Sequence, residues 1–212
     1  MACPASLAAC LSAGVSAGAP PASCHALAPP LDAFIVRDVL SASECAALLA
    51  EADSLGYSFW HAQPEASHRS FRSAETVEVR CPEVAEALWH RLRPHVRASL
   101  TLEAGKCDRG VEGTWVASGV NPVLLFTRYA AGSHFSPHTD GNNVLDLNCR
   151  SLYSVLLYLN TCAEGGGTTL FCPPGCASDQ RRFAADERGR LRWPSDWRVP
   201  LTTSSHALVI YV

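Results

Sequence analysis

From Val123 onward, strand-length hydrophobic runs alternate with turns rich in Gly, Pro and Asn, and this alternation restricts the fold more than any other feature. In the run 151–159 both alternating sets of side chains are largely apolar, so we expect a strand that is buried on both faces. Residues 173–199 are polar and are expected to form a long loop. The runs predict strands near 123–129, 133–138, 151–159, 168–172 and 206–212.

Two helices are predicted before these strands. Residues 41–44 read Ser-Ala-Ser-Glu, the spacing of a capping box, and the helix they begin should end near Leu55 with Gly56 as its terminator. A second helix begins at Cys81-Pro82-Glu83 and is expected to reach about Ser99. Short strands are expected at 31–39 and 76–79. Helices followed by many short strands indicate an α+β fold, with N-terminal helices packed on a double-sheet β-barrel or jelly roll.

The 212 residues fit one domain preceded by a tail. Residues 1–28 hold few large side chains and are expected to form a flexible, low-complexity leader, which leaves 29–212 as the domain. The leader has no Lys or Arg, which argues against a secretory or mitochondrial signal and favours the cytoplasm, while a secretory route stays open.

Charge and hydropathy exclude several classes of partner. The net charge is -3 without a block of like charges, so we expect no nucleic-acid partner. No apolar run is long enough for a transmembrane segment. The ten cysteines are irregularly spaced and form no Cys-x-x-Cys pair, which argues against a zinc finger, whereas disulfides and the oligomeric state stay open.

His138 and Asp140 stand one residue apart after an apolar run. In an extended segment their side chains would point to the same face, which brings an imidazole and a carboxylate together. Iron(II) accepts these two ligand types together. The alternative interpretation is a turn in which Asp140-Gly141 caps a loop.

Two tyrosines near this pair are candidates for a binding role. Tyr129 ends the strand before it, and Tyr158 lies in the apolar run after it. A buried tyrosine needs a partner for its hydroxyl. That partner is either the backbone or water, or else the carboxylate of a bound ligand.

The order Arg-Tyr-x-x-Gly-x-x-Phe-x-x-His-x-Asp at 128–140, then Tyr-Leu-Asn at 158–160 and Gly-Gly-x-Thr at 165–168, resembles the prolyl 4-hydroxylase-like family of Fe(II)- and 2-oxoglutarate-dependent dioxygenases. The Leu-Ser-x-x-Glu-Cys at 40–45 is similar to the start of such domains. The resemblance implies a double-stranded β-helix, cupin-like in form, with His138 and Asp140 as metal ligands. It also implies that Tyr158 meets the distal carboxylate of 2-oxoglutarate and that Tyr129 lines the cosubstrate pocket.

The implied reaction is oxidative decarboxylation of 2-oxoglutarate to succinate and CO2, coupled to hydroxylation of a C–H bond in a peptidyl proline or another protein, peptide or small-molecule substrate. Ascorbate is an implied cofactor that keeps the iron reduced. Trp60, Arg69, Arg72 and the loop 173–199 are candidates for the border of the site, and each is equally consistent with a surface or packing role.

The resemblance places a distal iron-binding His and a Lys or Arg for 2-oxoglutarate after the last strand, beyond Val212. His206 and His134 are poor matches to the ligand position. The expectation is therefore a truncated chain that turns over 2-oxoglutarate poorly. Two alternatives stay open, namely a catalytically inactive jelly-roll binding module and a zinc or calcium site on a lectin-like sandwich.

Overall fold

The structure is a computed structural model that describes residues 1–11, 23–27, 33–103, 111–162, 164–171, 198–200 and 208–211. The chain divides into two compact units, which are described separately. The first comprises Met1–Pro20, Leu40–Arg91 and Gly119–Ser151, and the second comprises Pro21–Val39, Leu92–Ser118 and Leu152–Val212.

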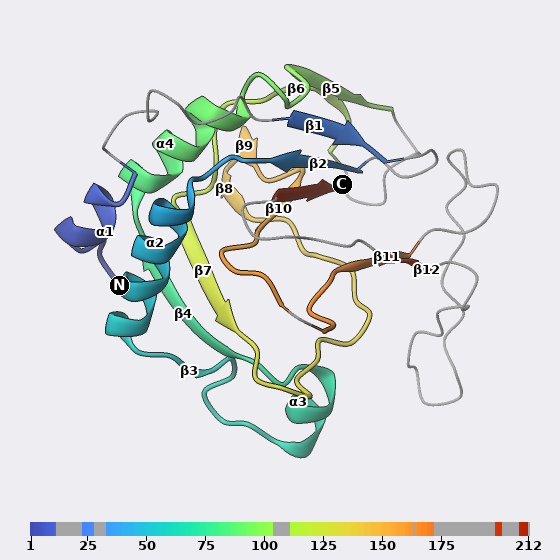
Figure 1. Ribbon diagram of the computed structural model, residues 1–212. Helices are drawn as coiled ribbons and strands as arrows, with labels where there is room; N and C mark the ends of the chain where they lie inside the picture. The colour runs from blue at the N-terminus through green and yellow to red at the C-terminus, as the bar shows by residue number, and fades with distance from the viewer. Residues whose placement is uncertain are drawn as a thin grey trace, which may run out of the picture. The chain divides into compact units, whose positions relative to one another are not determined.

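Helices and antiparallel sheets occur together, which confirms the α+β class (Figure 1). The described strands form separate sheets of two to four strands and no closed barrel, so the double-stranded β-helix stays a prediction. Within the part of the chain that the structure covers, no helix has the length and apolar character needed to cross a membrane.

The first unit is built on a three-stranded sheet in the order β3-β4-β7. In the register of β4 and β7, Val77 lies opposite Phe126 and Val79 opposite Leu124, and both valines are buried. The unit's core includes buried side chains of α2 (Cys45, Leu48, Ala52), α4 (Val84, Ala85, Leu88) and β4 (Val77, Val79). Its elements are α1 (Ala5–Ala9), α2 (Ala42–Leu55), β3 (Ser58–Phe59), α3 (Ala66–Phe71), β4 (Glu75–Arg80), α4 (Pro82–Leu92), β7 (Val123–Arg128), β8 (Val144–Asp146) and β9 (Cys149–Arg150).

The predicted capping box at the start of α2 is confirmed. The Ser41 hydroxyl accepts a hydrogen bond from the Glu44 amide at 3.2 Å, and the Glu44 carboxylate accepts one from the Ser41 amide at 2.8 Å. Gly56 ends the helix with a φ of 78°, a conformation that favours glycine. The Glu44 carboxylate also accepts hydrogen bonds from both Nη groups of Arg91 on α4, at 2.6 and 3.0 Å. These bonds join the two helices.

Two expectations for this unit are wrong. The second helix ends at Leu92 and not near Ser99, because Pro94 cannot continue a helix and the chain turns there with His95 and Val96 amides bonded to the Leu92 carbonyl. Residues 133–138 form no strand either. They make one isolated bridge, between Phe135 and Arg72, after a turn at Gly132.

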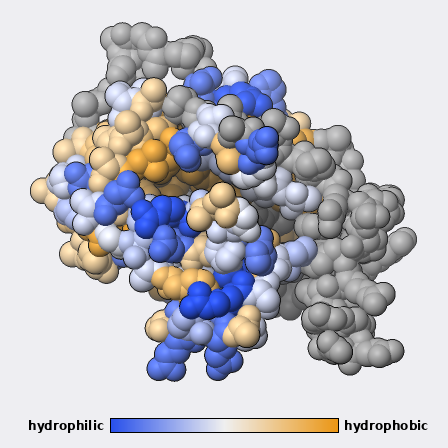
Figure 2. Space-filling view, turned by 60° about the horizontal axis from the view of Figure 1, so that its bottom comes forward, coloured by the Kyte–Doolittle hydropathy of each residue, from blue (hydrophilic) through white to orange (hydrophobic). Residues whose placement is uncertain are grey.

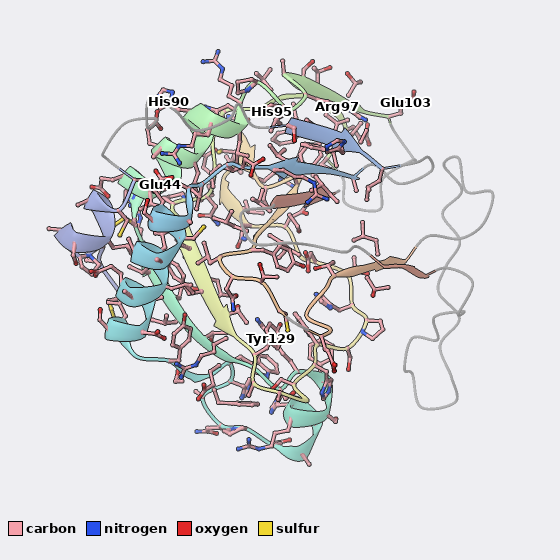
Figure 3. The ribbon with its side chains drawn as sticks, viewed as in Figure 1. Glu44, His90, His95, Arg97, Glu103 and Tyr129 are labelled. Carbon is pink, nitrogen blue, oxygen red and sulfur yellow. A yellow bond between two sulfur atoms is a disulfide. The ribbon has the colours of Figure 1, made fainter. Side chains whose placement is uncertain are left out.

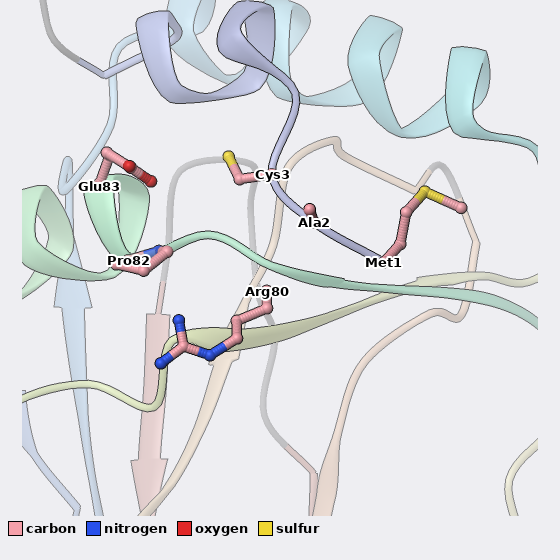
Figure 4. A pocket seen from close by; sticks show the side chains of 6 residues that line it. All are labelled: Met1, Ala2, Cys3, Arg80, Pro82 and Glu83. Carbon is pink, nitrogen blue, oxygen red and sulfur yellow. The ribbon is translucent and has the colours of Figure 1, made fainter.

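Part of the expected leader is built into the first unit. Leu7 of α1 is fully buried, and Ala2 makes a parallel bridge with Arg80. A disulfide joins Cys3 to Cys81, closing a sequence separation of 78 residues. An open pocket of about 560 Å³ lies beside this segment. Figure 4 shows the residues that line it, which are Met1, Ala2, Cys3, Arg80, Pro82 and Glu83. The interpretation of residues 1–28 as a flexible leader stays a prediction, and residues 12–22 and 28 lie outside the described part of the chain.

The second unit contains a four-stranded sheet in the order β1-β2-β13-β10. Val155 and Leu156 on β10 are 39% and 37% exposed, so the prediction that this strand is buried on both faces is wrong; among the described strands β10 is the edge of its sheet. Its strands are β1 (Ser23–Ala26), β2 (Ala33–Arg37), β5 (Ser99–Leu102), β6 (Gly113–Val116), β10 (Ser154–Leu157), β11 (Thr169–Phe171), β12 (Arg198–Pro200) and β13 (Leu208–Tyr211). Of the predicted loop 173–199, residues 173–197 lie outside the described part of the chain, and the last two residues belong to β12.

Candidate functional site

The segment that carries His138 is fixed to the end of α3. The Ser136 amide donates to the Phe71 carbonyl at 2.8 Å, and the Ser136 hydroxyl donates to the Ser70 carbonyl at 3.2 Å. The His134 amide donates to the Ser73 hydroxyl, and the Ser73 amide donates to the His134 carbonyl, both at 2.9 Å. These bonds link residues more than 60 positions apart and hold the loop after β7 in one place.

His138 and Asp140 converge as predicted. The Nε2 atom of His138 lies 3.0 Å from Oδ1 of Asp140, and the two side chains are 30% and 33% exposed. The Nδ1 atom of His138 lies 2.8 Å from the Ser136 carbonyl, to which it can only donate. In the neutral ring this leaves the lone pair on Nε2, directed toward the Asp140 carboxylate.

The pair is an imidazolium–carboxylate ion pair when Nε2 carries a proton, and a two-atom donor set when it does not. The pKa of His138 is raised, first by its hydrogen bond to Asp140, against the opposing effect of burial, with further contributions from the Ser136 carbonyl and from the Asp140 charge. The charge of Arg72 lowers it. An imidazole nitrogen and a carboxylate oxygen fit Fe(II), and also Zn²⁺ and Mn²⁺.

Aromatic rings support the imidazole. The Phe135 ring stacks on the His138 ring with centroids 3.8 Å apart, and the Phe71 ring meets both edge-on, at 6.1 Å from His138 and 5.3 Å from Phe135. Stacking restricts rotation of the imidazole, because a turned ring would lose the contact. In the sequence Phe135 is a position of the motif at 128–140, and its spacing of three residues from His138 is the signal that links the two.

Tyr129 directly follows β7 (Figure 3). Its exposed fraction is 45%. Its ring centroid lies 6.0 Å from Cζ of Arg72, whose guanidinium also lies 4.4 Å from the Phe135 centroid. Tyr129 therefore joins the His138 cluster through Arg72 and Phe135. Figure 2 brings the end of the molecule with α3 toward the viewer, where hydrophilic and hydrophobic residues are interspersed.

Tyr158 belongs to the second unit, where its hydroxyl shares a hydrogen bond with the Thr168 hydroxyl. In the structure, the partner of the Tyr158 hydroxyl is therefore a side chain, that of Thr168. The structure brings together His138, Asp140 and Tyr129 in one unit and Tyr158 with Thr168 in the other. Thr168 was missed as a site residue, although it is the Thr of the Gly-Gly-x-Thr motif.

Of the other bordering candidates, Arg69 lies over the Phe59 ring at 4.7 Å, and Trp60 donates from Nε1 to the Arg72 carbonyl at 2.7 Å. His134 does not join the donor pair. Its Nδ1 lies 3.2 Å from the Ser73 hydroxyl, and its Nε2 lies 2.9 Å from the Ser70 carbonyl. His206 lies outside the described residues.

Three potential metal ligands cluster elsewhere among the described residues, at Cys3, Cys81 and Glu83. Metals bind the cysteine thiolate, and these two sulfurs are joined in a disulfide. The disulfide form of this cluster therefore offers no thiolate.

No protein-family model matches the chain, and neither the curated proteins nor the solved structures gave a match.

Proposed function

We propose that this chain is an Fe(II)- and 2-oxoglutarate-dependent dioxygenase domain of the prolyl 4-hydroxylase type, built on a double-stranded β-helix, which hydroxylates a C–H bond of a peptidyl proline. The observation that carries the proposal is the 3.0 Å distance between His138 Nε2 and Asp140 Oδ1. The hydrogen bond from His138 Nδ1 to the Ser136 carbonyl orients the ring. The order of motifs around this pair supports the choice of reaction and substrate.

His138 and Asp140 would hold the iron. When bound, iron and 2-oxoglutarate supply an oxidation that releases succinate and CO2 and hydroxylates the substrate, and ascorbate would keep the iron reduced. The chain's own contribution is positional. The Ser136 carbonyl selects the tautomer with a free Nε2, and the Phe135 ring restricts rotation of the imidazole.

In the second unit, considered by itself, the Tyr158 and Thr168 hydroxyls are proposed to bind a carboxylate, the role in 2-oxoglutarate binding that the resemblance implies for Tyr158. Their hydroxyls already share a hydrogen bond, so together they offer a second proton to an incoming acceptor. Replacing Tyr158 with Phe removes one of the two hydroxyls and is expected to weaken 2-oxoglutarate binding by about tenfold.

The test is an anaerobic titration of the full chain with Fe(II) and 2-oxoglutarate, followed by absorption spectroscopy. A metal-to-ligand charge-transfer band should appear in the wild type and in His134→Ala, and it should be absent in His138→Ala. A band that persists in His138→Ala would overturn the assignment of the metal face.

One observation favours a second candidate, a module that binds ligand without turnover. Among the described residues, no third His, Cys, Asp or Glu side chain joins His138 and Asp140 in a group that could hold a metal ion. Succinate release in the presence of iron, ascorbate and 2-oxoglutarate separates the two candidates, since the binding module would form the complex but release none.

A further inference from the structure

Arg72 is held at the border of the metal face by its backbone. Its amide donates to the His68 carbonyl at 2.9 Å, and its carbonyl accepts from Trp60 Nε1 at 2.7 Å. It also bridges to Phe135 across the loop that carries the site. The side chain that leaves this fixed backbone places Nη2 3.1 Å from the Thr127 hydroxyl on β7.

The Arg72 guanidinium has no carboxylate partner in the described part of the chain. Its Nε atom is buried without a hydrogen-bond partner there, and Thr127 satisfies only one Nη group. Two other arginines of the same unit differ, since Arg91 pairs with Glu44 and Arg128 pairs with Glu75 and Asp53. A buried charged donor without a hydrogen-bond partner destabilises the fold, and the contacts of Arg72 with aromatic rings offset only part of that cost.

The same guanidinium is close to the donor pair. Its Cζ lies 4.4 Å from the centroid of Phe135, the ring that stacks on His138 at 3.8 Å. Tyr129 lies on another side at 6.0 Å and is partly exposed. A small ligand at the His138–Asp140 face would thus have one unpaired cation beside it, framed by two aromatic rings.

We propose that Arg72 binds a carboxylate, holding one end of a small dicarboxylate whose other end lies at the His138–Asp140 face. The planar guanidinium donates to both oxygens of a carboxylate in parallel, a geometry that a lysine does not reproduce. A single cation matches the charge of a carboxylate better than that of a phosphate dianion. The next arginine in the chain, Arg69, lies over the Phe59 ring and supplies no second cation at this place. The assignment rests on the proposed function for the identity of the dicarboxylate, 2-oxoglutarate.

The experiment is calorimetric titration of the full chain with 2-oxoglutarate and, separately, succinate, with and without Mn(II). Arg72→Gln should weaken both dicarboxylates by about ten- to a hundredfold. The Kd for Mn(II) alone should stay unchanged, because Arg72 donates no metal ligand. Arg69→Gln, the matched loss of a nearby arginine, should change neither affinity. Arg72→Lys keeps the charge but cannot donate two parallel hydrogen bonds, so its dicarboxylate affinity should lie between those of wild type and Arg72→Gln.

Far-UV circular dichroism and thermal unfolding of each variant check the fold, and Arg72→Lys serves where Arg72→Gln does not fold. Wild-type dicarboxylate affinity in both folded Arg72 variants would overturn the inference while leaving a metal site intact. If the wild-type chain does not bind Mn(II), the proposed function is refuted. Succinate binding without metal that depends on Arg72 would still support the carboxylate role of Arg72. Displacement of succinate by equimolar inorganic phosphate would overturn the choice of carboxylate.

Discussion

The His138 imidazole has a carbonyl on one nitrogen and a carboxylate on the other, so its protonation depends on both. The hydrogen bond to Asp140 is the largest cause of its raised pKa, burial opposes the shift, and the Ser136 carbonyl adds to it. Since the folded pKa lies above the ordinary value of 6.5, the pair stabilises the fold below that pH. The contribution is lost as the pH rises through the folded pKa. Metal binding has the opposite sign, because the metal takes the unprotonated Nε2 and competes with the proton.

The first prediction concerns this titration. Asp140→Asn should lower the pKa of His138, because it removes the carboxylate that stabilises the charged ring. An NMR titration that follows the Cε1 proton of His138 measures the change. Asp146→Asn removes a carboxylate elsewhere in the same unit and should leave the His138 titration as in wild type. An unchanged pKa in Asp140→Asn would show that the carboxylate does not govern the ring.

At the residue level the sequence predicted the convergence of His138 and Asp140 correctly, although the predicted cause was different. Alternation in a strand was expected to align them, whereas the structure has an irregular loop after Pro137 that α3 holds in place. Arg72 was only a bordering candidate, because its contacts with Thr127 and Phe135 join positions more than 50 residues apart. Local periodicity carries no information on such pairs.

Among the elements, α2 was the best predicted, since its capping box and its terminating Gly56 are local signals. The Glu44–Arg91 pair was not predictable, because it joins two helices across 47 positions. Burial raises the pKa of Glu44, but the hydrogen bonds from Arg91 and the Ser41 amide outweigh burial and leave that pKa below its ordinary value. Its stabilisation is therefore present above the unfolded pKa and is lost as the pH falls through the folded one.

The second prediction separates the two roles of Glu44. Ser41→Ala removes one cap and should lower the free energy of unfolding by about 1 kcal/mol. Glu44→Ala removes a cap and leaves the partly buried Arg91 unpaired, so it should cost more, about 2 kcal/mol. Urea unfolding at pH 7 measures both. Glu86→Ala, on the exposed face of α4, should cost less than about 0.5 kcal/mol. An equal cost for Ser41→Ala and Glu44→Ala would mean that Arg91 contributes nothing.

At the scale of the whole molecule, each unit is assembled from segments that are distant in the sequence. β13 lies between β2 and β10, with Val209 opposite Ile35 on one side and Leu156 on the other. The sequence predicted all three strands but not their order, since hydrophobic period identifies a strand and not its neighbour. The order matters because β13 supplies hydrogen-bond partners to two strands at once, from the far end of the chain.

The third prediction follows from this order. Deleting residues 208–212 should expose the facing edges of β2 and β10, because their backbone groups lose the strand between them. Amide hydrogen exchange in Ala33–Arg37 and Ser154–Leu157 should accelerate by at least about tenfold. Exchange in Glu75–Arg80, which pairs with β3 and β7 in the first unit, provides the internal control and should keep its rate. Removing Val212 alone leaves the pairing in place and should change neither region. Unaltered protection of β2 and β10 in the longer deletion would mean that another segment, and not β13, closes this sheet.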